Sequence, residues 1–414
     1  MADRTRRSRV GIEKIGAYPC SMSLDMSDLA RARGQDPSYP SKNLLLERRS
    51  VNPCWEDPVT MGVNAARQML SKEDLERIEL LVVGTESSPD QGKPLSTFVY
   101  RFLGIQPNCR NFEVKHACYG GTSALMMAAH WVASGASPGA KALVICTDQG
   151  RMHLGESFEY VLGAGAVALL VSDNPAVLEL ELEGNGYWTN EVGDTFRPTS
   201  REEAGNTDNS VYCYLEALEG AYGHFARKNG QVDFNTYFKK NLYHVPFAAM
   251  AYRAHRTLLR SQGRVSRADA ELHFQRKVKP ALTYNAQVGG TYTGSTFYSF
   301  IGLVDHSDDL APGDRIGIFA YGSGSCAEFY SAVIGPEAKQ RVAAIDLGRR
   351  LAARHPISVA EYEAVERQRT DLIDQPTYDV PLDGFSDLYQ RAYAGKELLV
   401  LKGLNGFFRK YDWS

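Results

Sequence analysis

The chain of 414 residues has no long apolar run and no strong excess of either charge. No apolar segment reaches the ~20 residues that a helix needs to span a bilayer, and the first residues lack the apolar core of a signal peptide. Because 46 Lys and Arg stand against 49 Asp and Glu, the net charge of -3 gives no electrostatic footprint for nucleic acid. We therefore expect a cytoplasmic protein that binds neither a membrane nor nucleic acid.

Cysteine is scarce, and its spacing argues against two common uses. None of the seven cysteines forms a Cys-x-x-Cys pair. Without such spacing a zinc site is not indicated, and in a chain of this size a disulfide framework is not expected. We expect free thiols and no metal. The cysteines lie at positions 20, 54, 109, 118, 146, 213 and 326.

Short apolar runs alternate with helical patterns along the chain. Buried strands are expected at 78–84, 142–147 and 165–172, and helices at 58–70 and 123–134. Strand and helix in repeated alternation predict an α/β fold. The length exceeds the usual size of a single domain, so two domains or one large duplicated core is expected.

The pattern divides the chain into four parts. A basic tail occupies residues 1–9, and a first half with three expected buried strands follows at 10–183. Residues 184–235 are polar and aromatic and indicate a cap or insertion with one helix. Residues 236–414 repeat the pattern of the first half, without a repeat at the level of individual residues.

Cys118 stands where a β-type run breaks at a small-residue turn and continues as an apolar helix. The free N–H groups and the dipole of a helix N-terminus stabilise a thiolate, the nucleophilic form of cysteine. A reactive sulfur is therefore one interpretation. The other is a small buried hydrophobe, which is the more usual role of an isolated cysteine.

Three more segments place reactive residue types beside turns. Glu86 follows a buried strand, at the edge where open α/β sheets bind ligands, or is a solvated loop acid that caps a helix. His244 precedes a helix expected to start at Pro246, and is a base or a structural group. The loop 321–325 offers backbone N–H groups to an oxyanion, although such Gly-Ser turns are common.

Taken together, these segments resemble the 3-hydroxy-3-methylglutaryl synthases of the thiolase superfamily. The main motifs are 84–87 (Gly-Thr-Glu-Ser), 117–122 (Ala-Cys-Tyr-Gly-Gly-Thr), 244–247 (His-Val-Pro-Phe) and 321–324 (Tyr-Gly-Ser-Gly). Further matches are Glu56-Asp57, 163–167, Asp194 with Arg197-Pro198, and 328–330. The resemblance runs from about residue 10 to the C-terminus. It implies a thiolase-like fold of two similar halves in a layered αβαβα arrangement, and a homodimer.

Weaker matches are similar to the stand-alone synthases that act in polyketide β-branching. They lie at 96–97, at 108–115, and in the two ending segments 398–402 and 408–413. They distinguish between subfamilies and not between folds.

The resemblance implies a condensing mechanism with Cys118, Glu86 and His244 as catalytic residues. Cys118 accepts an acetyl group from a donor thioester, and backbone N–H groups at Cys118 and at Gly322-Ser323 hold the oxyanion. Glu86 removes a methyl proton, and the enolate attacks the β-carbonyl of a β-ketoacyl thioester that His244 orients. Water then cleaves the Cys118 thioester, and no metal or redox cofactor is required.

The resemblance also implies supporting residues. The expected substrate-binding residues are Gly322, Ser323, Thr122, Arg253 and Asp194. Asp90, Asp148 and Asp194 match acids that line or brace the site in the family, with turn or cap carboxylates as the alternative.

Two positions depart from the family pattern. Gly290 stands where the family usually has an asparagine that helps to bind the acceptor or the oxyanion. Loss of an oxyanion donor typically costs about 3–4 kcal/mol in the barrier, and a water or Asn285 is a possible substitute. Near the histidine, Tyr252 and Arg253 stand where coenzyme-A-using members tend to carry lysines, which favours a carrier-protein-bound substrate.

Three hypotheses follow. The first is a synthase in polyketide β-branching, with one acyl carrier protein as acetyl donor and a second carrying the acceptor. The second is a hydroxymethylglutaryl-coenzyme A synthase of isoprenoid (mevalonate) biosynthesis. The third, motivated by Gly290, is a scaffold that binds carrier proteins without condensing anything.

Overall fold

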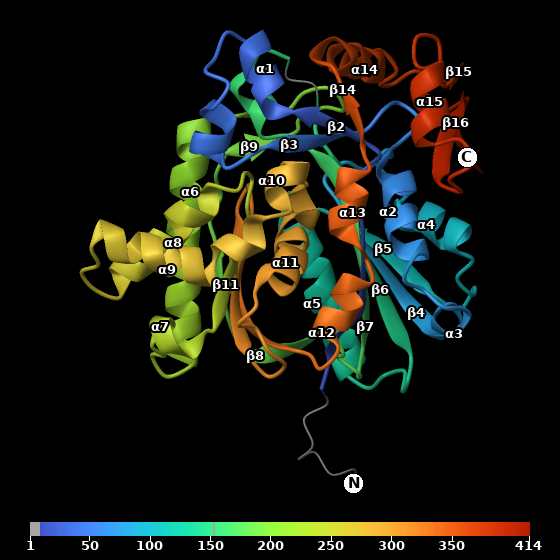
Figure 1. The fold of residues 1–414 in the computed structure, drawn as a ribbon. Coiled ribbons are helices and arrows are strands. Elements are labelled where there is room, and N and C mark those ends of the chain that lie inside the picture. Colours follow the sequence, from blue (N-terminus) through green and yellow to red (C-terminus); the bar gives the residue numbers. More distant parts are fainter. Residues whose placement is uncertain (1–8, 152–153) are drawn as a thin grey trace.

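A computed structural model describes residues 9–151 and 154–414. Of the predicted basic tail, residues 1–8 lie outside the described residues. A nine-stranded sheet in the order β11-β12-β13-β8-β1-β7-β6-β4-β5 runs through the described part of the molecule (Figure 1). Its strands are β1 (Gly11–Tyr18), β4 (Ile78–Gly84), β5 (Arg110–Val114), β6 (Lys141–Gln149), β7 (Ala164–Ser172), β8 (Leu178–Thr189), β11 (Lys240–Tyr243), β12 (Arg315–Gly322) and β13 (Cys326–Ile334).

Three small sheets and a set of helices surround this sheet. The small sheets combine β2 (Met22–Asp25), β3 (Arg48–Val51) and β14 (His355–Ile357), then β15 (Tyr378–Asp379), β16 (Leu399–Asn405) and β17 (Phe408–Trp413), and the pair β9 (Thr195–Phe196) and β10 (Ala204–Gly205). The α-helices are α1 (Met26–Ala32), α2 (Pro58–Arg67), α3 (Lys72–Arg77), α4 (Ser96–Leu103), α5 (Gly120–Ala133), α6 (Thr207–Lys228), α7 (Phe234–Tyr237), α8 (Met250–Ser261), α9 (Arg267–Lys277), α10 (Asn285–Val288), α11 (Ser295–His306), α12 (Ala338–Ala343), α13 (Leu347–Ala352), α14 (Val359–Asp371) and α15 (Ser386–Ala392).

Helices cover both outer faces of the long sheet. Two further helices, α5 and α11, lie between its two ends. Successive strand side chains point to opposite faces, so Leu80 and Val82 of β4 pack with α5 and α11, while Leu81 and Val83 pack with α2 and α4. At the other end of the sheet, a third apolar cluster joins α6 and α8 to Phe319 of β12. Helices α5 and α11 thus form the middle of a layered αβαβα, thiolase-like fold (Figure 1).

The two halves have related strand pairings. In the first, β4 is parallel to β5 and β6, and β7 pairs antiparallel with β6. In the second, β11 is parallel to β12, and β13 pairs antiparallel with β12. The long strand β8 pairs with β1 at its start and with β13 along its length. The predicted limit of the first half at residue 183 therefore falls inside a strand.

Most predicted elements are confirmed, with one clear exception. The strand predicted at 78–84 is β4, and the strand predicted at 142–147 lies within β6. The helix predicted to begin at Pro246 begins at Met250 instead. The N–H of Ala249 donates to the carbonyl of Leu44 at 3.0 Å, so this tertiary contact holds the segment after His244 out of the helix.

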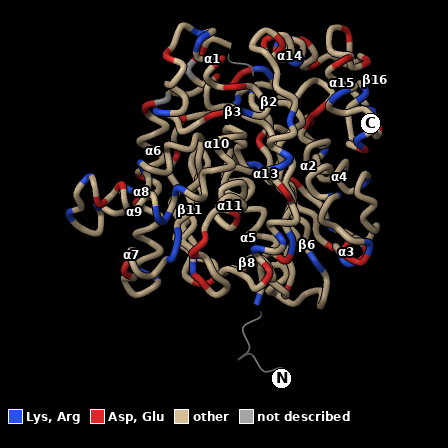
Figure 2. Tube along the Cα trace, in the orientation of Figure 1, with Lys and Arg blue, Asp and Glu red and all other residues tan. Residues whose placement is uncertain are grey.

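Charges are mixed over the described chain. Figure 2 shows basic and acidic residues interspersed along the trace, in keeping with a net charge near zero. Within the described residues, none of the helices combines the length and the apolar character needed to cross a membrane.

The end of β4 touches the start of α5 through a glycine. A Cβ atom at Gly84 would lie 2.5 Å from the carbonyl oxygen of Gly120 and 2.7 Å from the nitrogen of Gly121. Because these are backbone atoms, they have no rotamer that relieves such a contact. The close approach brings the loop after β4 beside the loop that carries Cys118.

We predict that Gly84→Ala destabilises the protein by about 1–3 kcal/mol, the usual cost of overpacking a close-packed interior. Thermal unfolding measures this. Gly348→Ala is the matched control, because its Cβ would meet only the Tyr284 hydroxyl, at 3.6 Å, inside helix α13. An unchanged melting temperature for Gly84→Ala would show that this contact does not constrain the fold.

Candidate functional site

The carboxyl ends of two neighbouring strands bring Cys118 and Glu86 together. Strands β4 and β5 are parallel and adjacent, Glu86 follows β4, and Cys118 lies between β5 and α5. The Cys118 thiol donates to Glu86 Oε1 at 3.2 Å. Ala117, with a φ of 41°, turns the chain sharply between the strand and the sulfur.

Burial gives Glu86 an unusual acidity. It raises the Glu86 pKa to about 7, because a charged carboxylate loses its hydration. The nearby charge of Arg197 lowers this pKa, and the charge of Asp148 raises it. Glu86 therefore changes its protonation state near neutral pH, which suits a general acid and base.

The predicted stabilisation of a Cys118 thiolate is wrong. Burial, followed by the charge of Glu86, raises the Cys118 pKa well above its usual value. Helix α5 begins at Gly120, two residues after the sulfur, and the thiol faces a carboxylate rather than a free N–H group. The resting group is a neutral thiol with a proton acceptor in contact.

Asp148 holds the Glu86 loop in place from inside the protein. Its carboxylate accepts hydrogen bonds from the Glu86 N–H at 2.9 Å, the Ser87 hydroxyl at 2.8 Å and the Thr85 hydroxyl at 2.9 Å. Thr293 of the second half donates to it through its N–H at 3.1 Å. Asp148 thus braces the site, as one of the two interpretations predicted.

The other two acids differ from each other. Asp194 is buried and accepts from the Tyr321 hydroxyl at 2.6 Å and the Gly324 N–H at 2.9 Å, so it braces the loop after β12. Asp90 is exposed and accepts from the N–H groups of Gly92 and Lys93, as a turn carboxylate does.

The loop after β12 meets the cysteine loop directly. A Cβ at Gly322 would lie 2.5 Å from the His116 carbonyl oxygen and 2.7 Å from the Tyr119 nitrogen. Gly322 and Ser323 therefore lie against the turn that carries Cys118, as the motif order predicted. Their part in the oxyanion contacts expected there stays a prediction.

His244 follows β11 and is buried. Neither ring nitrogen has a hydrogen-bond partner among the described residues. Burial lowers the His244 pKa to about 3, so the imidazole is neutral at physiological pH. Two unsatisfied nitrogens on a buried ring indicate a group that binds a ligand rather than one that serves the fold.

Thr122 and Arg253 lie apart from this arrangement. Thr122 is buried in the first turn of α5, where its side chain bonds Tyr330. Arg253 is exposed on α8. Their predicted roles in substrate binding stay predictions.

Arg197 contacts Glu86, although the sequence assigned it no role beyond its place in a matching motif. Its Nε lies 3.7 Å from Glu86 Oε2, and its Nη1 donates to the Glu86 carbonyl at 3.0 Å. A second carboxylate, Glu203, lies 3.0 Å from Nη2, and the guanidinium covers the ring of Tyr292 at 4.8 Å. The pairing of Asp194 with Arg197-Pro198 was the signal that pointed here.

The surroundings of Gly290 and the hydrogen bonds of Asn285 decide whether Asn285 can replace the missing asparagine. A Cβ at Gly290 would lie 2.7 Å from the carbonyl oxygens of both Val161 and Pro246, so backbone atoms fill the space that a side chain would need. Asn285 donates to the Ser295 carbonyl at 3.0 Å and accepts from Ser299 at 2.9 Å. Because its amide is occupied by α11, Asn285 does not replace the asparagine.

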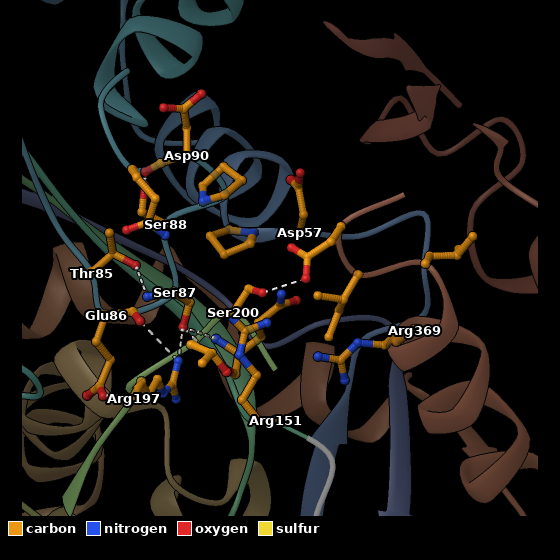
Figure 3. Close-up of a pocket in the computed structure, with 18 of the residues that line it drawn as sticks. Asp57, Thr85, Glu86, Ser87, Ser88, Asp90, Arg151, Arg197, Ser200 and Arg369 are labelled. Carbon is orange, nitrogen blue, oxygen red and sulfur yellow. Dashed lines mark hydrogen bonds and ion pairs between the residues drawn. The ribbon is translucent and has the colours of Figure 1, made fainter. Parts of the chain in front are cut away.

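A cavity of about 1050 Å³ opens beside Glu86 (Figure 3). Glu86, His116 and Ser323 line one part of it, and Arg151 and Arg369 line another. In the described part of the chain, no group of three or more His, Cys, Asp or Glu side chains is arranged to hold a metal ion.

A cysteine thiol that faces a glutamate at the ends of two parallel strands, in a thiolase-like fold, is the arrangement expected of a condensing enzyme with a cysteine acyl acceptor. Residues 6–176 match the family described as hydroxymethylglutaryl-coenzyme A synthase N terminal, and residues 259–394 match its C-terminal counterpart. The chain belongs to the hydroxymethylglutaryl-coenzyme A synthase family.

Several relatives span nearly the whole chain. It is 37% identical to the polyketide biosynthesis 3-hydroxy-3-methylglutaryl-ACP synthase PksG of Bacillus subtilis, over 97% of this chain and 99% of that protein. It is 34% identical to the hydroxymethylglutaryl-CoA synthase of Enterococcus faecalis, over 89% and 95%. The crystal structure of the curacin biosynthetic pathway HMG synthase with acetyl donor-ACP has a TM-score of 0.93 and 39% identity, over 98% of this chain and 100% of that one.

We predict that Glu86→Gln makes Cys118 more reactive toward a small alkylating agent. Removal of the negative charge beside the sulfur lowers the thiol pKa, so a larger fraction is thiolate at a given pH. The rate of iodoacetamide labelling at pH 8, read by mass spectrometry of the Cys118 peptide, measures this.

Cys118→Ala gives the background from the other cysteines. Equal or slower labelling of Glu86→Gln, in a protein that keeps its melting temperature, would show that Glu86 does not hold the thiol protonated.

Proposed function

We propose that the protein is a carrier-protein-dependent hydroxymethylglutaryl synthase of polyketide β-branching. The observation that carries the proposal is the contact between the Cys118 thiol and Glu86 Oε1 at 3.2 Å, inside a member of this family. This contact supports a mechanism in which one carboxyl group, that of Glu86, takes part both in the acylation of Cys118 and in the deprotonation of the acetyl group.

In the first step, Cys118 attacks the carbonyl carbon of an acetyl thioester. Glu86 accepts the thiol proton across the 3.2 Å contact, and the carbon–sulfur bond to the donor breaks. The departing thiolate takes the proton back from Glu86. This sequence restores the Glu86 carboxylate, which the next step requires.

In the second step, Glu86 removes a proton from the methyl group of the acetyl-enzyme. The resulting enolate attacks the β-carbonyl carbon of the acceptor, and the new alkoxide is protonated by Glu86. Because the low pKa of His244 keeps its ring neutral, His244 acts as a hydrogen-bond donor to the developing oxyanion rather than as an acid. Water then cleaves the Cys118 thioester and releases a carboxylate.

The names of the relatives support carrier proteins as partners. PksG is named an ACP synthase, and the curacin enzyme was solved with its acetyl donor-ACP. We propose a donor carrier protein with an acetyl group and a second carrier with the β-ketoacyl acceptor. The proposed reaction then needs only the two thioesters and water, with no metal or redox cofactor.

We also propose a homodimer that joins through β5. This strand lies at the edge of the main sheet in the described chain, and its residues are partly or fully exposed. An open edge offers unpaired backbone groups to a second strand. The cytoplasmic location stays a prediction from the sequence.

The main alternative is a hydroxymethylglutaryl-coenzyme A synthase, which the similarity to the enzyme of Enterococcus faecalis favours. We predict that Cys118 gains an acetyl group faster from acetyl-carrier protein than from acetyl-coenzyme A. Intact mass measures both rates, and Cys118→Ala controls for acetylation elsewhere. Faster labelling by coenzyme A would reject the carrier-protein proposal, and acetylation without turnover of acetoacetyl-carrier protein would support the scaffold alternative.

A further prediction concerns pH. Only the carboxylate form of Glu86 accepts a proton, so exchange of the acetyl methyl hydrogens with deuterated water rises with pH and levels off above about 7. Glu86→Gln slows this exchange by about 10²–10⁴-fold. Mass spectrometry of the acetyl-Cys118 peptide measures the exchange.

Arg197→Met tests the assignment of this pH dependence. Loss of the guanidinium removes an influence that lowers the Glu86 pKa, so the rise moves to higher pH. An unchanged pH profile in this variant would mean that a different group accepts the proton.

A further inference from the structure

The cavity beside Glu86 is larger than the two reacting acyl groups. Its volume of about 1050 Å³ reaches the upper end of pockets that hold whole drug-sized ligands, roughly 300–1,000 Å³. An acetyl group and an acetoacetyl acceptor fill only a small part of such a space. The remainder lies within reach of the acceptor chain beyond its β-carbon.

Past Arg197, this cavity contains a cation that has no ion pair among the described residues. Among the described residues, the Arg151 guanidinium has neither an ion pair nor a hydrogen bond, and its Nε is shielded from solvent. Burial, together with the charges of Arg197 and Arg369, lowers the Arg151 pKa to about 10, although Glu203 acts in the opposite direction. An enclosed, unpaired guanidinium is costly for the folded state and gains most from an anionic ligand.

The neighbouring arginines differ from Arg151 in this respect. Arg197 is paired with Glu203 at 3.0 Å, and Arg369 is paired with Glu366 at 2.8 Å. Arg369 also donates to the carbonyl of Gly150 at 2.9 Å and so fixes the backbone just before Arg151. The fold therefore positions the free cation while its two neighbours are already neutralised.

Figure 3 shows how these groups are arranged. Arg197 lies beside Glu86, Arg151 lies next to Arg197, and Arg369 lies beyond. A chain that starts beside Glu86 and follows the cavity wall thus passes Arg197 before it meets Arg151. The row of arginines along the cavity therefore extends away from Glu86.

We propose that Arg151 forms a subsite for a carboxylate at the far end of the acceptor chain. The planar guanidinium matches a carboxylate through two parallel hydrogen bonds. The substrate class is then a β-ketoacyl thioester whose chain continues past the β-carbonyl and ends in a carboxylate. This proposal rests on the condensing function proposed above.

The test compares acceptors that differ only at the end of the chain. Six-, eight- and ten-carbon β-ketoacyl thioesters on the carrier protein, each with a terminal carboxylate or a terminal methyl group, are assayed together with acetoacetyl-carrier protein. At the length that reaches Arg151, we expect kcat/KM for the carboxylate to exceed that for the methyl analogue by about tenfold or more, mainly through KM.

Arg151→Gln should abolish this preference while turnover of acetoacetyl-carrier protein continues, and Arg151→Lys should restore part of it. Arg349→Gln is the matched control, because Arg349 lies on α13 with 81% of its side chain exposed. It should keep the full preference.

Three results would overturn the subsite: no preference in the unaltered protein at any length, a preference that survives in Arg151→Gln, or an equal loss for both chain ends. The comparison in the unaltered protein is informative even if Arg151→Gln fails to fold. If acetoacetyl-carrier protein itself is not turned over, the proposed function fails instead, so the two failures are distinguishable.

Discussion

The buried carboxylate of Asp148 is the constraint on which the rest of the site depends. It accepts hydrogen bonds from the loop after β4 and from Thr293 of the second half, whose hydroxyl lies 2.5 Å away. A buried carboxylate is costly for the folded state unless several donors surround it. The loop after β4 and the segment of Thr293 therefore pack together around Asp148. Thr293 also donates to the carbonyl of Gly84 at 3.1 Å. The position of Glu86 is therefore fixed by both halves of the molecule.

This arrangement also explains the acidity of the site. Glu86 and Glu203 both lie beside the Arg197 guanidinium, and Asp148 is buried against the Glu86 loop. Burial is the main reason why the Glu86 pKa lies near 7, and the charges of Asp148 and Glu203 raise it further. Burial and the charge of Glu86 together disfavour a thiolate at Cys118. The site thus does not store an activated nucleophile. In the proposed mechanism the thiolate forms during acyl transfer, when Glu86 takes the proton, and the same carboxyl group then serves the next proton transfer.

Local patterns in the sequence predicted the framework well, because a strand such as 78–84 is set by its own apolar run. They predicted the Cys118 and Glu86 positions through motifs and through the rule that parallel strands end at one edge. They failed where a residue distant in the sequence determines the property in question. The thiol pKa depends on Glu86, the start of α8 depends on Leu44, and the role of Asn285 depends on Ser295 and Ser299. Arg151 carried no pattern at all, since a missing counter-ion is a tertiary property.

Gly290 shows how such a distant contact changes the chemistry. The carbonyls of Val161 and Pro246 occupy the space of its side chain, and its N–H donates to Val161 at 2.8 Å. Its backbone N–H is therefore already used. Pro246 is only two residues from His244, whose two ring nitrogens have no partner among the described residues. With no side chain at 290 and with Asn285 bonded to α11, the neutral imidazole is the group to which the proposed mechanism assigns the hydrogen bond to the acceptor oxygen. Under the proposed mechanism, condensation then depends on His244 without help from a side chain at position 290.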